Sequence, residues 1–194
     1  MKLAFFKKIE DLSFTLSFHK FSLVLIIIFG LLARAYKMPF VILYDEAATY
    51  LDYCDGGFTS FLRIWNVNNH LINTLLMKVS IEIFGNGVIA LRLPSFMFGI
   101  TSHLLIYYIS KKIYEKRVAL FSTLIYSCTP LLIHFESQAR GYSIKVTFTL
   151  LLFIACFHFL QKPRKTYLVL IAFVSSLGFL TIFSFIFPFL GFLI

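Results

Sequence analysis

The sequence has few charged residues. Asp, Glu, Lys and Arg make up 14% of its 194 residues, whereas soluble globular proteins carry about 25%. Acidic residues are scarcer still, with 9 in the whole chain, while hydrophobic residues reach 59% and include 25 phenylalanines. This little charge cannot cover the surface of a soluble domain, which indicates an integral membrane protein.

Several functional classes lack their usual signatures. The three cysteines, Cys54, Cys128 and Cys156, have no metal-ligand spacing and give no support to a disulfide framework or a zinc site. The chain has no glycine-rich phosphate loop, so cytoplasmic nucleotide binding is not supported either. The net charge of +9 could suggest nucleic acid, but the distribution of Lys and Arg around apolar runs explains it better, and we expect no nucleic-acid partner.

Apolar runs predict about five to six transmembrane helices. A membrane-spanning helix needs about 20 mostly apolar residues. Because the sequence stops within apolar residues, we also expect residues 1–194, a single membrane domain, to be the N-terminal part of a longer chain. The predicted fold class is therefore an all-α polytopic helix bundle, with spans at 21–36, 88–110, 118–135 and 141–160, and a fifth helix and the start of a sixth within 167–194.

The positive-inside rule predicts the orientation of the bundle. Segments 1–20, 111–117 and 162–165 together hold 11 of the 18 basic residues. Since basic flanks remain in the cytoplasm, the N-terminus is expected inside. Residues 37–87 then form the first extracytoplasmic loop of a multi-pass cell-membrane protein.

The second half of this loop predicts an amphipathic helix at the membrane interface. Five apolar residues recur there at helical spacing. The alternative is a short additional span, which would place Lys78 and Glu82 in lipid at a large cost. The apolar positions are Leu71, Leu75, Leu76, Val79 and Ile83.

Nearly half of the acidic residues lie in the segment "LYDEAATYLDYCDGG", residues 43–57. Adjacent carboxylates such as Asp45 and Glu46 could act as a general base, bind a divalent cation, or do both. The alternative is a solvated loop that happens to carry acids. Asp52 and Asp55 precede Gly56-Gly57 and are interpreted as helix-end and turn residues.

A histidine lies at the start of the predicted amphipathic helix. Asn68 and Asn69 precede His70, and asparagine is a favoured helix N-cap. His70 could then face a substrate at the interface, or have a structural role only.

Two arginines are expected at the same outer face. Arg92 lies about four residues into the second span, and Arg140 lies in the tight turn between the third and fourth spans. Their planar guanidinium groups could bind a lipid phosphate, or they could simply extend toward the headgroups. Glu136 and Gln138, in the same turn, could hydrogen-bond a polar substrate or Arg140.

Six stretches in order resemble one known family. They are "ARAY", "YDEAATY", "NNHLINTLLMKVSIEIFG", "LRLPSFMFG", "SKKIYEKRVAL" and "ESQARGYS". Together they resemble the GT-C membrane glycosyltransferases, in the branch related to protein O-mannosyltransferases and the lipid A aminoarabinose transferase. The resemblance covers roughly residues 21–183.

The resemblance implies transfer of a sugar from a polyprenyl-phosphate donor, among the membrane lipids, to an acceptor hydroxyl on a lipid, polysaccharide or protein. Asp45 matches the family's catalytic acid and would be the general base, with Glu46 orienting the acceptor or holding a cation. Arg92 and Arg140 would bind the phosphate. His70 matches a His-Pro-Pro position, but both prolines are replaced in "HLI".

The residues predicted to bind the substrate are His70, Arg92, Gln138 and Arg140. No organic cofactor is implied, and a bound divalent cation remains an open alternative because too few ligands are visible to define its coordination. Two other functional classes also remain open. One is a multi-span transporter or flippase, and the other is a truncated, non-catalytic remnant.

Overall fold

The computed structural model describes residues 2–56, 62 and 69–192, and only the backbone of residues 2–17. Asn68 lies outside this part of the chain. Over the described residues the structure is helical without a strand, which confirms the all-α class. The elements are α1 (Lys2–Lys37), α2 (Tyr44–Thr49), the π-helical turn η1 (Tyr50–Cys54), α3 (Leu71–Phe84), α4 (Val88–Ile113), α5 (Lys116–Cys128), α6 (Pro130–Glu136), α7 (Tyr142–Gln161), α8 (Lys165–Thr181), the 3-10 turn η3 (Phe183–Phe185) and α9 (Ile186–Gly191).

Three described helices are long and apolar enough to cross a membrane: the segment Phe18–Lys37 of α1, and the whole of α4 and α7. The third predicted span is broken, because α5 and α6 meet at an angle of 64°. Pro130 begins α6, and proline is favoured at a helix start, where its missing N–H is not needed. Counted as one span, this pair gives a fourth crossing, while α8 is apolar but has only 17 residues.

The helices expose apolar side chains and bury small polar ones, as expected of a bundle surrounded by lipid. Phe21, Phe29 and Leu32 of α1 are exposed. Between α4 and α7, by contrast, Ser102 and Thr147 are buried and their hydroxyl oxygens lie 2.8 Å apart. Hydrogen bonds between small residues therefore hold the two central helices together.

A small apolar core joins α7, α8 and η3. Phe148, Val174 and Phe185 are buried in it. A Cβ on Gly178 would lie 2.4 Å from the Phe185 ring, so glycine is required for this contact.

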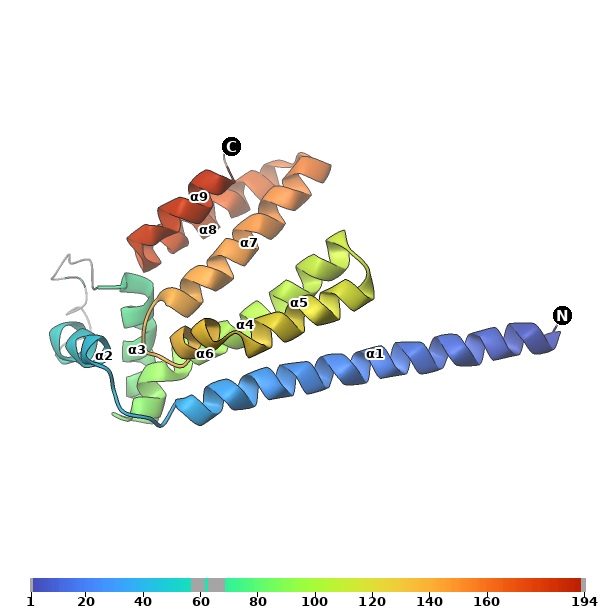
Figure 1. The fold of residues 1–194 in the computed structure, drawn as a ribbon. Helices are drawn as coiled ribbons and strands as arrows, with labels where there is room; N and C mark the ends of the chain where they lie inside the picture. Colours follow the sequence, from blue (N-terminus) through green and yellow to red (C-terminus); the bar gives the residue numbers. More distant parts are fainter. Residues whose placement is uncertain (1, 57–61, 63–68, 193–194) are drawn as a thin grey trace.

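Helix α3 crosses the end of the bundle and packs against α4 (Figure 1). Its polar side chains face the protein, since Asn73, Thr74, Lys78 and Ser80 are buried. The predicted apolar stripe is half-exposed or exposed instead. This arrangement suits a helix that lies at the interface with its apolar side toward lipid.

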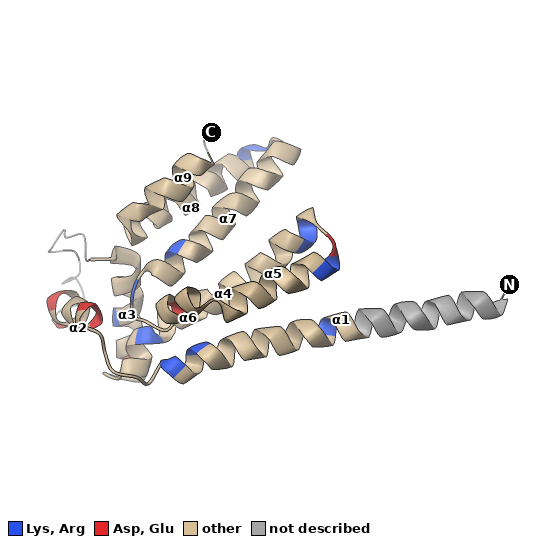
Figure 2. Cartoon of the chain, viewed as in Figure 1, with Lys and Arg blue, Asp and Glu red and all other residues tan. Residues whose placement is uncertain are grey.

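The two ends of the bundle differ in charge (Figure 2). Acidic residues gather on α2, at the end where α1 finishes, whereas the basic connections 111–117 and 162–165 lie at the opposite end. We call the first of these the α2 end; it comprises loop 38–43, α2, α3 and loop 137–141.

Candidate active site

At the α2 end, Asp45 and Arg140 lie side by side. An Arg140 nitrogen, Nη1, is 3.5 Å from Oδ2 of Asp45 and 3.4 Å from its backbone oxygen. The Asp45 side chain is 62% exposed and that of Arg140 only 8%. The structure thus brings the predicted base next to a predicted phosphate ligand from 95 residues further along the chain.

Glu46 points the opposite way, into the protein, and pairs with Arg92. Arg92 Nε donates to Glu46 Oε1 at 2.8 Å and Nη2 donates to Oε2 at 2.6 Å. The backbone N–H groups of Leu43 and Ala139 also donate to this carboxylate. Burial by itself raises the pKa of Glu46, but these hydrogen bonds outweigh it, so the pKa lies below its ordinary value.

Arg92 also holds loop 38–43. Its nitrogens donate to the carbonyl oxygens of Met38, Phe40 and Val41 at 2.8, 3.0 and 3.1 Å. Each of its three nitrogens therefore has an acceptor within the protein. In this arrangement, Glu46 and Arg92 join α2, α4 and two loops, and neither side chain faces the exposed carboxylate of Asp45.

His70 lies behind loop 137–141. Its Nδ1 accepts a hydrogen bond of 2.8 Å from the Gly141 N–H, and its ring packs edge-on against Tyr142. Burial, with a smaller effect from Arg140, lowers the pKa of His70 to about 4. The imidazole is therefore neutral at physiological pH and acts here as a hydrogen-bond acceptor.

Two further residues hold this loop, and sequence reasoning missed both. Asn73 Nδ2 donates to the Ala139 carbonyl at 3.2 Å, and Ser95 Oγ donates to the Arg140 carbonyl at 2.9 Å. Together with Glu46 and His70, Asn73 and Ser95 hydrogen-bond the backbone of residues 139–141. The only available signal was that Asn73 and Ser95 are polar positions within predicted apolar helices.

Gln138 faces a different space from Arg140. Its Nε2 lies 2.7 Å from Nε2 of His134, and both residues line a pocket of about 180 Å³ at the α2 end. We call this the Lys37 pocket. Its lining includes Lys37, Phe40, Val41, Leu43, His134 and Gln138.

The described residues contain no group of three or more His, Cys, Asp or Glu side chains close enough to bind one metal ion. Asp45 and Glu46, the predicted cation ligands, point in different directions and contact different arginines.

Comparison with known proteins identifies the family. The sequence profile described as dolichyl-phosphate-mannose-protein mannosyltransferase matches residues 71–194, well over half of the chain. The chain belongs to this family. Searches of curated proteins and of solved structures find no match.

Membership makes the chain a membrane glycosyltransferase of the GT-C type. The matched region contains Arg92, Gln138 and Arg140, and it begins one residue after His70. Asp45 and Glu46 lie before it, so the link between the acidic pair and the mannosyltransferase segment comes from the structure, through the contacts of Arg92, Ala139 and Arg140.

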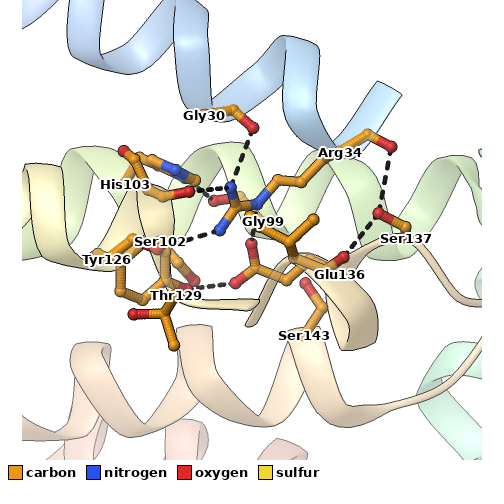
Figure 3. Close-up of polar contacts among 12 residues, drawn as sticks. Gly30, Arg34, Gly99, Ser102, His103, Tyr126, Thr129, Glu136, Ser137 and Ser143 are labelled. Carbon is orange, nitrogen blue, oxygen red and sulfur yellow. Dashed lines mark hydrogen bonds and ion pairs between the residues drawn. The ribbon is translucent and has the colours of Figure 1, made fainter. Parts of the chain in front are cut away.

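A second buried ion pair lies deeper in this glycosyltransferase (Figure 3). Arg34 Nε donates to Glu136, which also accepts a hydrogen bond from the hydroxyl of Tyr126. Arg34 and Glu136 are fully buried. Glu136 was expected to bind a substrate or Arg140, but its carboxylate contacts Arg34 and Tyr126 instead.

The same cluster connects α1 to the loop that carries Arg140. Ser137 Oγ donates to the Arg34 carbonyl at 3.1 Å, and Arg34 Nη1 donates to the Gly30 and Ser127 carbonyls. Loop 137–141 therefore starts from a segment that is fixed by charge and hydrogen bonds.

We expect protonation of His70 to destabilise the protein. Its pKa is lowered from 6.5 to about 4 in the folded state, so the unfolded chain binds this proton more readily. The contribution of the neutral ring is complete above pH 6.5 and is lost as the pH falls toward 4, by roughly 3 kcal/mol. Thermal unfolding of the detergent-purified protein at pH 4 to 8 measures the effect.

His70→Asn is the matched control, because Asn can accept the Gly141 hydrogen bond but does not titrate. The advantage of the wild type over His70→Asn in melting temperature should shrink as the pH falls below 6.5, because only the wild type loses stability through protonation of this residue. A constant difference across this range would show that His70 is not held neutral by the fold.

Proposed function

We propose that the protein transfers a sugar from a polyprenyl-phosphate donor to an acceptor hydroxyl at the extracytoplasmic membrane face. Asp45 acts as the general base. The observation that carries the proposal is the exposed Asp45 carboxylate beside the buried guanidinium of Arg140, at the end of the bundle away from the basic connections. Within the family, we favour the branch related to protein O-mannosyltransferases and the aminoarabinose transferase of lipid A.

The reaction follows from this geometry as a single displacement. Asp45 takes the proton of the acceptor hydroxyl as its oxygen forms a bond to the anomeric carbon. The bond from that carbon to the phosphate oxygen breaks, and its electron pair leaves with the polyprenyl phosphate. One displacement inverts the anomeric configuration, so the base and the leaving phosphate must lie on opposite sides of the sugar.

Arg140 is placed to assist in two ways. Its contact with Asp45 is longer than the 2.7–2.9 Å typical of a charge-assisted hydrogen bond, so both groups can adjust around a substrate. Because the leaving phosphate lies on the opposite side of the sugar, the positive charge of Arg140 acts on the Asp45 carboxylate and orients it toward the acceptor hydroxyl. Ser95, which holds the Arg140 carbonyl, and His70, which holds the Gly141 N–H, keep the guanidinium in place.

Glu46 and Arg92 are proposed as positioning residues. Four donor groups occupy the two Glu46 oxygens, and the pair fixes α2 against α4 and loop 137–141. Asp45 precedes Glu46 directly, so the buried pair determines where the exposed carboxylate points. In this role, Glu46 orients the acceptor only through Asp45.

Reconstitution tests the function. The purified full chain in proteoliposomes is supplied with polyprenyl-phosphate mannose and candidate acceptors of lipid, polysaccharide and peptide type. We expect acceptor-dependent release of polyprenyl phosphate and an acceptor heavier by one sugar in mass spectrometry. Movement of the intact donor between leaflets without release of polyprenyl phosphate would support a transporter instead.

A further inference from the structure

We propose that the Lys37 pocket binds the phosphate group of the lipid-linked sugar donor. This inference rests on the proposed function, which does not say where the donor's phosphate binds. The pocket lies at the α2 end, between the last residue of α1, loop 38–43 and α6, and has a volume of about 180 Å³. This volume accommodates a phosphate with part of its attached groups.

The charges around the pocket favour an anion. Lys37 is exposed, and no carboxylate is among the pocket's lining residues in the described structure. Arg92 also lines the pocket, but its charge is balanced by Glu46 and its nitrogens donate within the protein. The net positive charge therefore comes from Lys37, at the point where α1 ends.

Gln138 adds a hydrogen-bond donor. Its amide nitrogen contacts both nitrogens of the His134 ring, at 2.7 and 3.2 Å, and its two N–H groups could turn toward a phosphate oxygen in the pocket. Because the backbone of the next residue, Ala139, is bound by Glu46 and Asn73, Gln138 is held in this position.

Two residues that line the pocket are close in sequence to Asp45 and Arg140. Leu43 and Gln138 line it, and Asp45 and Arg140 each follow two residues later. At no more than about 3.6 Å per residue, the Cα atoms of Leu43 and Gln138 lie within roughly 7 Å of those of Asp45 and Arg140, respectively. The pocket therefore lies near the Asp45–Arg140 pair at the α2 end.

The surroundings indicate a lipid rather than free phosphate. Tyr36, Phe40 and Val41 are exposed beside the pocket, at the end of a membrane-spanning helix. Exposed apolar and aromatic residues at this depth face the acyl-chain boundary and the headgroups. A phosphate attached to a polyprenyl chain reaches this level of the membrane directly.

Binding measurements test the assignment without relying on catalysis. The full chain in neutral-lipid nanodiscs is titrated with a short polyprenyl phosphate. We expect Lys37→Glu to weaken binding roughly 10- to 100-fold, since it removes a charge-assisted contact and adds repulsion. Lys37→Arg should retain most of the affinity. Lys20→Glu is the matched control, because Lys20 is an exposed lysine on the same helix about 25 Å away.

The outcomes separate this inference from the proposed function. Equal binding by the wild type and Lys37→Glu overturns the pocket assignment, even if the wild type transfers sugar. Lys37-dependent binding without any sugar transfer supports the pocket and contradicts the function. Equal competition by inorganic phosphate would show a free-phosphate site, and equal competition by an anionic phospholipid would show a general headgroup site; either result overturns the donor assignment.

Discussion

Asp45→Asn is expected to reduce sugar transfer by roughly 10²- to 10⁴-fold, the range over which a general base contributes. Asparagine has nearly the same shape but cannot accept the acceptor's proton. The assay is acceptor-dependent release of polyprenyl phosphate by the purified protein at saturating donor. The loss should appear in kcat, because Asp45 is not expected to bind the donor.

The fold should tolerate this change. The Asp45 side chain is 62% exposed and its contact with Arg140 is 3.5 Å, so the pair contributes at most about 1 kcal/mol to stability. Membrane insertion and the melting temperature should therefore stay close to those of the wild type. A large drop in either would mean that lost activity reports misfolding and not chemistry.

Asp52→Asn provides the matched control. Asp52 is an exposed carboxylate seven residues further on, in η1, and the substitution is the same. We expect nearly full activity from it. If Asp45→Asn remains fully active, or if both variants lose activity equally, Asp45 is not the base.

The sequence was sufficient to predict the all-α membrane fold and to place Asp45 and Arg140 at the same end of the bundle, but not their direct contact. Apolar run length predicts a membrane span directly, and topology places every outer loop at the same end of the bundle. The broken third span was less predictable, because Pro130 divides it without interrupting its apolar character.

The pairing of buried charges could not be predicted from the sequence. Helical periodicity indicates which residues share a face of one helix, but not which residue of another helix they meet. Arg34 and Glu136 are 102 residues apart, and Glu46 and Arg92 are 46 apart. The orientation of α3 was uncertain for the same reason, since in lipid an apolar stripe need not face the protein.

Breaking the Arg34–Glu136 pair is expected to cause the largest loss of stability. Both side chains are fully buried, so removing one leaves the other charge without its partner in a medium of low polarity. Arg34→Met and Glu136→Met should each lower the free energy of unfolding by about 3–5 kcal/mol. Denaturant titration of the detergent-solubilised protein measures this loss.

The double variant separates charge pairing from simple loss of volume. Arg34→Met with Glu136→Met leaves no unpaired charge, so it should be more stable than either single variant. Arg117→Met serves as the control, because Arg117 is exposed at the opposite end of the bundle and should change stability little. Additive losses in the double variant would show that the two side chains contribute independently.

The sugar-transfer activity of the double variant then tests how the Arg34–Glu136 pair affects the position of Arg140 at the active site. Ser137 is bound to the Arg34 backbone carbonyl, which a change of side chain leaves in place. If the backbone alone positions loop 137–141, the double variant should recover sugar transfer along with stability. If stability returns but transfer does not, the charges themselves are needed to place Arg140, three residues after Ser137, against Asp45. Arg140 contacts Asp45 from a loop that begins directly after Glu136. We therefore expect sugar transfer to recover along with stability. The pair would then act by fixing the start of the loop, and any packing that fixes it equally well should suffice.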